Sequence, residues 1–381
     1  MAENRKWRMG MVGGGPGAFI GPVHKMAAEL DGRMELVAGA FSQSAEKSRV
    51  AGEAFRIDPA RAYANFNEML AAERMRKDAI DFVVIATPNN THFPVAKAAL
   101  ESGFPVMSDK PATMSYAEVE ELEKLVQKSG LPYGLTHTYA GYSLVREARH
   151  LCRSGQLGKI RKIVAEYLQG WLSQPIENTG QKQAAWRSDP KFNGPGGCIG
   201  DIGVHAFHLT EYVSGLRVTS LNAVLRTVVP GRKLDDDCSA MLRFDNGSEG
   251  ALLASQIATG EGNGMRLRIY GENGSVDWHQ EDPNRLRVKW DDKPEETRHA
   301  AAGYLSADAR AVTRLPGGHP EGYIEAFAVL YREFADALDA RRDGKSDAIP
   351  ETLPGIEAAV RGMRFVECAI ESSRKKNWLD F

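Results

Sequence analysis

Three polar side chains of the sequence could together move a proton to or from a carbinol oxygen. Lys110 stands in a Ser-Asp-Lys-Pro segment, and Asp201 and His205 are four residues apart in Gly-Asp-Ile-Gly-Val-His. Side chains four apart on a helix share one face, with Cβ atoms about 6 Å apart. Histidine suits general acid–base catalysis near neutral pH, and a lysine can stabilise a developing alkoxide. This set fits the oxidation of an alcohol whose hydride leaves for a cofactor.

A glycine cluster after the first apolar run offers a place for that cofactor. Trp7 to Val12 is predicted as a strand, and Gly13 to Gly21 follows as Gly-Gly-Gly-Pro-Gly-Ala-Phe-Ile-Gly. Glycines let the backbone approach a pyrophosphate at the N-terminus of the next helix. A strict G-x-G-x-x-G would end at Ala18, whereas an enlarged loop ending at Gly21, before His24, fits the helix start better. An ordinary tight turn is the alternative. The predicted cofactor ligands here are Gly13, Gly15, Pro16, Gly17, Ala18, Phe19 and Ile20.

Two further polar segments follow predicted strands, at the edge where a parallel sheet presents its ligands. Ala79 to Ala86 is nearly continuous in apolar residues, as expected when both faces of a strand are covered, and Thr87 to His92 follows it. Ser108 to Pro111 follows a short strand predicted over 105–107. The cofactor ligands predicted from these segments are Thr87, Pro88, Asn89, His92, Asp109 and Lys110.

The second predicted strand, Met34 to Phe41, lacks the acidic residue that usually binds the ribose 2'-hydroxyl of NAD. Ser42 and Gln43 stand at its tip, and Lys47 follows in the next helix. Ser42 with a nearby cation could accept a 2'-phosphate, so the cofactor is NAD or NADP. Alternatively, Lys47 and Arg49 are only solvated helix residues.

The first 139 residues alternate apolar runs with helical patterns, which predicts βαβ units and a Rossmann-type parallel sheet. Ser44 and Ser115 are predicted helix N-caps, and Gly130 a helix end. The segment 132–136 is predicted as a sixth strand. The chain is therefore expected to be an α/β protein with an N-terminal dinucleotide-binding domain over 1–139.

Residues 140–381 are predicted to form an α+β domain with a large, mostly antiparallel sheet. Hairpin signals occur at Asp245-Asn246-Gly247 and Glu272-Asn273-Gly274. The predicted elements are helices over 142–154, 201–214, 321–341 and 353–373, a strand over 160–169, strands over 218–290, and loops over 173–197 and 291–320. The helix over 353–373 could pack back toward the N-terminal domain.

Substrate ligands are predicted mainly on the polar loop before Asp201. Aromatic rings and cations suit a polyhydroxylated ring, although the tryptophans could instead only anchor the loop. His319, in Gly317-Gly318-His319-Pro320, could cap a site, including that of a neighbouring subunit. The candidates are Tyr139, Trp171, Lys182, Trp186, Arg187, Asp201, His205 and His319.

The charge, the apolar runs and the cysteines of the sequence exclude several classes of partner and of site. The formal net charge is -2 with interspersed acids and bases, which argues against a nucleic-acid surface. The longest apolar runs fall short of the ~20 residues of a membrane span. The four cysteines are scattered singly, so neither a metal site nor a disulfide framework is indicated, and a cytoplasmic location is expected. A broad antiparallel sheet with one uncovered face favours a homodimer or homotetramer.

These motifs together resemble the Gfo/Idh/MocA family, which includes glucose–fructose oxidoreductase and inositol dehydrogenase. The resemblance rests on the glycine loop, Ala-Thr-Pro-Asn-x-x-His, Asp-Lys-Pro and Gly-Asp-x-x-x-His. It implies an NAD(P)-dependent dehydrogenase that oxidises a secondary ring hydroxyl of an inositol or pyranose to a ketone, or the reverse. It also implies Lys110 and His205 at the reacting oxygen, with Asp201 beside them. Thr136-His137-Thr138-Tyr139 departs from the family's commoner Asn-Arg pattern, which leaves that substrate contact open.

Two other functions fit nearly the same residues. An NAD-dependent glycosidase would oxidise C3 transiently, eliminate a glycoside and add water, with no net redox change. It needs an extra base, which Tyr139, His137 or His205 could supply. A non-catalytic cofactor-binding sensor is disfavoured by the presence of Lys110, Asp201 and His205 together.

Overall fold

A computed structural model describes residues 5–345 and 349–381 of the chain. The chain forms two compact units, each made of two segments. The first unit contains Met1–Thr136 and Phe327–Val360, and the second contains His137–Ala326 and Arg361–Phe381. Within the described residues, no helix is long and apolar enough to cross a membrane.

The first unit is built on a parallel sheet with strand order β2-β1-β3-β4-β5. The order reverses at β1, so the carboxyl ends of β1 and β3 flank the switch point at which such sheets bind ligands. The strands are β1 (Trp7–Gly13), β2 (Met34–Ala40), β3 (Phe82–Ala86), β4 (Val106–Ser108) and β5 (Tyr133–Leu135).

The prediction of a sixth strand over 132–136 was wrong in its count, because that segment is the fifth strand of the sheet. Between β2 and β3 the chain reaches the sheet edge at one residue only. Ala62 forms an isolated bridge to Gly39, and Tyr63 N donates to Gly39 O at 2.8 Å. A 3-10 turn at Pro59–Arg61 precedes this bridge, and no longer ladder follows it.

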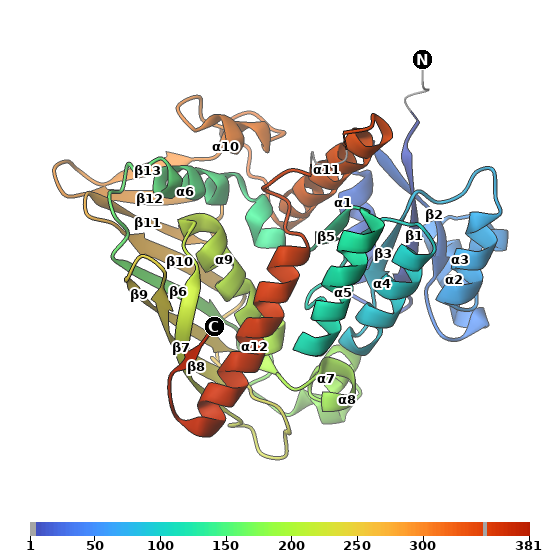
Figure 1. Cartoon of the computed structure of the whole chain (residues 1–381), viewed down its shortest axis with the longest axis horizontal. Helices are drawn as coiled ribbons and strands as arrows, with labels where there is room; N and C mark the ends of the chain where they lie inside the picture. Colours follow the sequence, from blue (N-terminus) through green and yellow to red (C-terminus); the bar gives the residue numbers. More distant parts are fainter. Residues whose placement is uncertain (1–4, 346–348) are drawn as a thin grey trace. The chain divides into compact units, whose positions relative to one another are not determined.

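Helices pack on both faces of this sheet (Figure 1). α4 contacts α3 and α5, whereas α1 contacts α11 through His24 and Tyr331. β3 is buried at every residue, as its apolar run predicted. The predicted caps are confirmed, because Ser44 and Ser115 accept hydrogen bonds from backbone N–H groups and Gly130 has a left-handed conformation. The helices are α1 (Ile20–Glu29), α2 (Ala45–Phe55), α3 (Phe66–Arg74), α4 (His92–Glu101), α5 (Tyr116–Ser129) and α11 (Tyr323–Arg342).

The second unit is built on a nine-stranded sheet with order β13-β12-β11-β10-β6-β9-β8-β7-β14. All neighbouring pairs are antiparallel except β6 and β9, which confirms the predicted mostly antiparallel sheet. Both predicted hairpin turns join antiparallel strands. The strands are β6 (Lys162–Leu168), β7 (Val218–Arg226), β8 (Asp237–Phe244), β9 (Glu249–Ser255), β10 (Gly264–Tyr270), β11 (Gly274–His279), β12 (Arg285–Trp290), β13 (Glu296–His299) and β14 (Leu379–Asp380).

Helices cover one face of this sheet, among them α6 (Ser143–Arg153) and α9 (Val204–Ser214) (Figure 1). Phe365 of α12 (Ile356–Lys375) stacks on Phe207 of α9, and both rings belong to the core of the unit. Along β8 buried and exposed residues alternate, so the opposite face of that strand stays in contact with solvent.

Two segments predicted as loops contain short helices. Residues 173–197 include a 3-10 turn, α7 (Lys182–Arg187) and α8 (Pro190–Asn193), and residues 291–320 include β13 and α10 (Ala307–Ala311). The Gln181 and Asp189 side chains accept hydrogen bonds from the backbone N–H groups of Ala184 and Lys191, in the first turns of α7 and α8. Such local capping can start a helical turn within a polar segment that shows no apolar periodicity.

Candidate active site

The glycine loop of the first unit is shaped by close backbone contacts. Gly13 has φ 86°, and a Cβ there would collide with the Ala86 carbonyl oxygen; at Gly15 it would collide with that of Phe41. Gly14 N donates to Ala86 O at 2.9 Å, and Gly21 packs against Gly14. The loop therefore presents bare backbone in front of α1, a cradle that fits the pyrophosphate of a dinucleotide.

The tip of β2 carries no carboxylate. The partly exposed Ser42 accepts a hydrogen bond from Ser44 N at 3.3 Å, and Gln43 and Lys47 are exposed. Arg49 forms an ion pair with Glu53 on the surface of α2. Of the two cations predicted here, Arg49 is thus engaged along its own helix.

The loops after β3 and β4 are joined by the fully buried His92. Its Nδ1 lies 2.6 Å from Pro111 O and its Nε2 lies 2.8 Å from Thr87 O. Asp109 Oδ1 accepts from Lys110 N at 2.9 Å and from Thr136 Oγ1 at 2.7 Å. The backbone of Lys110 is therefore fixed by its neighbours at the edge where its side chain is predicted to act.

Sequence reasoning missed a buried histidine beneath this edge. His24 is 0% exposed, and its Nδ1 lies 2.6 Å from the hydroxyl of Tyr331. Burial lowers the pKa of His24 to about 4, although the charge of Asp109 opposes the shift. The partner, Tyr331, stands on α11 far along the chain, so no local pattern marks the pair.

In the second unit, Asp201 lies in a π-helical turn, Ile199–Gly203, that leads into α9. The predicted helix over 201–214 thus begins with a wider turn than expected, a feature frequent at functional sites. Asp201 Oδ2 accepts hydrogen bonds from Gln256 Nε2 at 2.8 Å and from Arg187 Nε at 3.2 Å. The carboxylate is therefore oriented from two sides.

His205, at the start of α9, is buried among rings. Its Nδ1 lies 3.4 Å from Nδ1 of His137, and its ring centroid lies 5.0 Å from that of Tyr139. The ring of His208, also on α9, stacks on the ring of His137 with centroids 4.0 Å apart.

A hydrogen-bonded network extends from Tyr139 next to His205. The Tyr139 and Tyr167 hydroxyls are bonded to each other, Tyr167 donates to Asn263 Oδ1 at 2.8 Å, and Asn263 Nδ2 donates to Tyr139 at 3.2 Å. Gln169 links this network to Trp171, whose Nε1 donates to Gln169 Oε1 at 3.0 Å. Burial raises the pKa of both tyrosines well above the usual value, so both hydroxyls stay protonated.

The sequence reasoning missed most of this network. Tyr167, Gln169, Gln256 and Asn263 lie on or beside β6, β9 and β10, and the parallel pairing of β6 with β9 brings the first three to one end of the sheet. The sequence does show polar residues at the ends of these three strands. Their clustering could not be predicted, because the sequence does not show which strands pair.

The substrate candidates on α7 divide into two groups. The Arg187 guanidinium lies 4.1 Å from the ring centroid of Trp186 and reaches Asp201, so these two residues join the site. Lys182 is exposed at the start of α7.

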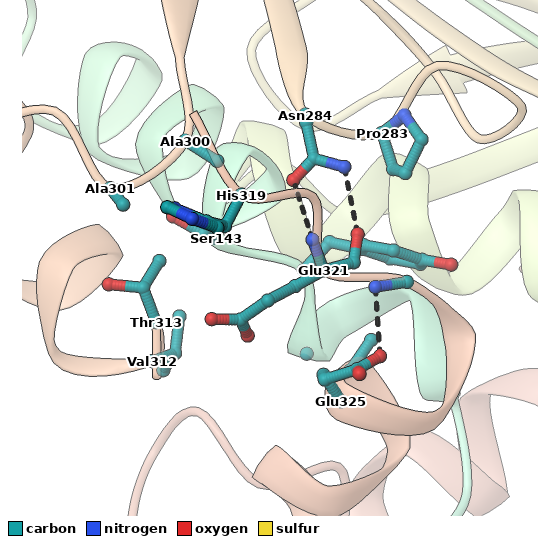
Figure 2. A pocket seen from close by; sticks show the side chains of 14 residues that line it. Ser143, Pro283, Asn284, Ala300, Ala301, Val312, Thr313, His319, Glu321 and Glu325 are labelled. Atoms are coloured by element: carbon teal, nitrogen blue, oxygen red, sulfur yellow. Dashed lines mark hydrogen bonds between the residues drawn. The ribbon is translucent and has the colours of Figure 1, made fainter. Parts of the chain in front are cut away.

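His319 lines a separate pocket of the second unit, shown in Figure 2 with Ser143, Asn284, Glu321 and Glu325. Asn284 Nδ2 donates to Glu321 O at 2.8 Å, and Gly322 N donates to Glu325 Oε2 at 2.9 Å. Asp201, His205 and Tyr139 do not line this pocket. The capping role of His319 stays a prediction.

Both units of the chain match models of known protein families. Residues 7–137 match the family model described as "Oxidoreductase family, NAD-binding Rossmann fold", and residues 145–277 match the model of the GFO/IDH/MocA C-terminal domain. The uncharacterized oxidoreductase YfiI of Bacillus subtilis is 32% identical over 98% of this chain and 96% of its own length.

Two further similar proteins carry names that describe ligands. The crystal structure of an inositol dehydrogenase homolog from Azotobacter vinelandii, complexed with NADH and myo-inositol, has a TM-score of 0.93 and 34% identity, covering 99% of this chain and 98% of that one. The levoglucosan dehydrogenase of Pseudarthrobacter phenanthrenivorans is 27% identical over 79% of this chain and 80% of its own length.

Proposed function

Because the chain belongs to the Gfo/Idh/MocA family of NAD-binding oxidoreductases, we propose that it oxidises a secondary ring hydroxyl of an inositol or a pyranose to a ketone, or catalyses the reverse reduction. The observation that carries this proposal is the setting of His205. A histidine suited to proton transfer lies beside the buried hydroxyl and amide network that begins at Tyr139. The complex of a relative with NADH and myo-inositol supports a polyhydroxylated ring as the substrate class.

In the proposed reaction, each group has a separate task. The bound NAD would accept the hydride. Lys110 would donate a hydrogen bond to the reacting oxygen and stabilise its developing negative charge. His205 would take the hydroxyl proton, and Asp201, oriented by Arg187 and Gln256, would accept a hydrogen bond from a neighbouring hydroxyl of the ring.

The choice between NAD and NADP depends, in this proposal, on Ser42. No carboxylate at the tip of β2 would repel a 2'-phosphate, so NADP should be accepted. Ser42→Asp should shift the preference toward NAD by about 1–3 kcal/mol, the scale of a like-charge contact against a lost charge-assisted hydrogen bond. Fluorescence titrations with NADH and NADPH measure the shift. A wild-type protein that rejects NADPH more than about a hundredfold would show that another residue enforces the choice.

The proposed activity is tested by incubating the protein with NAD or NADP and a panel of inositols, hexoses and glycosides. The absorbance of the reduced nicotinamide and the sugar products are followed in the same samples. Accumulation of NADH with a ketone product supports the dehydrogenase. Glycoside cleavage without net cofactor reduction would instead establish the glycosidase, and tight NADH binding with no product from any compound would favour a sensor.

The glycosidase receives less support from the structure than the dehydrogenase does. Its extra base would have to remove a proton from carbon at neutral pH. The Tyr139 hydroxyl is buried and hydrogen-bonded, and its raised pKa keeps it protonated. Tyr139 is therefore a poor candidate for that base.

We also propose that the exposed face of the nine-stranded sheet joins two copies of the chain. Val224, Met241 and Tyr270 are exposed there on β7, β8 and β10. Apolar side chains on a broad sheet face favour an interface between identical subunits. Light scattering should give the mass of a dimer or tetramer, and Met241→Glu should lower it. A monomeric wild-type protein would overturn this assignment.

A further inference from the structure

We propose that His137 is a positioning residue for His205: the two imidazoles share one proton between their Nδ1 atoms, and this pairing directs the Nε2 lone pair of His205 toward the substrate. The inference rests on the proposed function, in which His205 is the general base. It assigns a specific role to a histidine that stands in a departure from the family's commoner sequence.

The geometry of the two rings supports a shared proton. Their Nδ1 atoms lie 3.4 Å apart, and the rings meet edge to face at 83° with centroids 5.3 Å apart. His137 is 1% exposed and His205 8% exposed, so little water competes for the contact. Two protonated Nδ1 atoms would direct two N–H bonds at each other. Hence one Nδ1 carries the hydrogen and the other accepts it.

The side that carries this hydrogen decides what His205 can do. With the hydrogen on His205 Nδ1, the Nε2 of His205 is unprotonated and can accept a hydroxyl proton. With the hydrogen on His137 Nδ1, a neutral His205 is protonated at Nε2 and cannot act as a base. Alcohol oxidation therefore requires His205 as the donor and His137 as the acceptor.

The same contact stabilises the charged state formed during oxidation. The hydroxyl proton moves to His205 Nε2 as the hydride moves to the cofactor, and His205 becomes an imidazolium. Its Nδ1–H then donates to the lone pair of a neutral His137, whose own proton is on Nε2. His205 later returns to the neutral form by releasing the proton to solvent. An orienting acceptor behind a catalytic histidine is the same logic by which a carboxylate supports the base in hydrolytic triads.

The ring that stacks on His137 is uncharged. The ring of His208 stacks on it at 4.0 Å with an interplanar angle of 3°, and desolvation lowers the pKa of His208, so that ring is uncharged at neutral pH. Arg146, on α6, donates to Ala140 O at 2.6 Å and adds positive charge nearby. The titratable and charged groups around the pair are His208 and Tyr212 on α9, Tyr139, Tyr167, Asp201 and Arg146.

A matched pair of variants tests the proposal. His137→Asn keeps a side-chain oxygen that can accept from His205 Nδ1, whereas His137→Leu keeps bulk but removes the acceptor. We expect His137→Leu to lower kcat about 10–100-fold with KM for the polyol nearly unchanged, and His137→Asn to recover most of the loss. Equal loss in both variants, or wild-type kcat in His137→Leu, would overturn the proposal.

The pH profile gives a readout that a merely structural role would not move. Without its acceptor the His205 imidazolium is less stable, so it releases its proton more readily and its pKa falls. The acid limb of kcat/KM should therefore shift to lower pH in His137→Leu and stay near the wild-type position in His137→Asn. An unchanged limb in His137→Leu would contradict the shared proton. Thermal unfolding and NADH binding of both variants verify that they are folded.

Nitrogen NMR of the full-length protein with labelled histidines tests the pair without any turnover. The signal of His205 is identified by its loss in His205→Asn. At a pH where His205 is neutral, we expect protonation at Nδ1 in the wild type and a mixture of tautomers in His137→Leu. A wild-type His205 protonated at Nε2 would overturn the proposal. The expected tautomer in a protein that oxidises no polyol would leave the pairing intact and refute the proposed function instead.

Discussion

The two units differ in what they use to build a binding surface. In the first unit, the loop after β1 depends on missing side chains, because a methyl group at Gly13 or Gly15 would meet a backbone carbonyl. In the second unit, Asp201, His205 and Tyr139 are set in place by other side chains. A surface made of backbone requires glycine at fixed positions and so leaves a motif in the sequence. A surface made of interlocking side chains leaves almost none.

The largest effect is expected for Lys110, the side chain of the first unit that we propose to act on the reacting oxygen. Lys110→Ala should lower turnover at least ~100-fold while NADH affinity changes only a few-fold. The alanine keeps the Lys110 N–H that donates to Asp109, so the loop should hold its shape. Steady-state kinetics and NADH titration measure both effects, with Lys128→Ala, at an exposed position near the end of α5, as the control. Near-normal turnover would show that Lys110 has no role in the mechanism. The first unit would then contribute only the backbone of its glycine loop to the site.

The next effect is a decrease in the free energy of unfolding at acidic pH, caused by the buried His24 of the first unit. Its pKa is about 4 when folded, below the ordinary 6.5 of the unfolded chain. Above pH 6.5 both states are neutral; as the pH falls toward 4 only the unfolded state gains the proton, so the free energy of unfolding decreases. The full loss is about 3 kcal/mol. Chemical unfolding of the wild type and His24→Asn at several pH values should show a shallower decline in the variant; parallel curves would contradict the assignment.

A smaller effect should follow from adding one methyl group to the first unit. In Gly15→Ala the new Cβ must displace the backbone near Phe41, which costs about 1–3 kcal/mol of overpacking. NADH affinity should fall by roughly 10–100-fold. Gly303→Ala is the matched control, because a Cβ at that position meets nothing within 4 Å. Unchanged affinity in Gly15→Ala would show that the loop does not approach the cofactor as closely as proposed.

The smallest effect tests the side-chain network of the second unit. Tyr139→Phe removes a hydroxyl bonded to Tyr167 and Asn263, worth about 1 kcal/mol. We expect a several-fold change in the KM for the polyol and no change in NADH affinity. A change in KM without a change in NADH affinity would assign Tyr139 to the polyol site of the second unit and not to cofactor binding. A change in NADH affinity alone would contradict that assignment.

The sequence predicts this fold well wherever the signal is local. Alternating apolar patterns gave both sheets, and Ser44, Ser115 and Gly130 marked helix ends correctly. The errors arise where the outcome depends on distant residues. The segment over 132–136 is the fifth strand and not the sixth, and the chain between α2 and α3 makes a single bridge to the sheet. The parallel pairing of β6 with β9 cannot be read from either segment alone.

The same division applies to the candidate site. Asp201 and His205 were recognisable because four residues of spacing place both on one helical face. The partners that orient Asp201 come from α7 and from the residue after β9, and no spacing rule connects them. Tertiary packing decides which of many polar residues meet, and a single sequence does not record it.

The discontinuity of the first unit has a consequence for synthesis on the ribosome. Phe334 and Tyr331, which pack on Phe82 of β3 and His24 of α1, belong to the returning segment Phe327–Val360. That segment is translated only after the whole of His137–Ala326. While the second unit is being made, the strands and helices of the first have already emerged, with the surface meant for α11 still uncovered. The first unit is therefore the first to begin translation, but it is complete only when Phe327–Val360 has been made. Until then, the apolar side chains that pack against this segment stay exposed in the nascent chain.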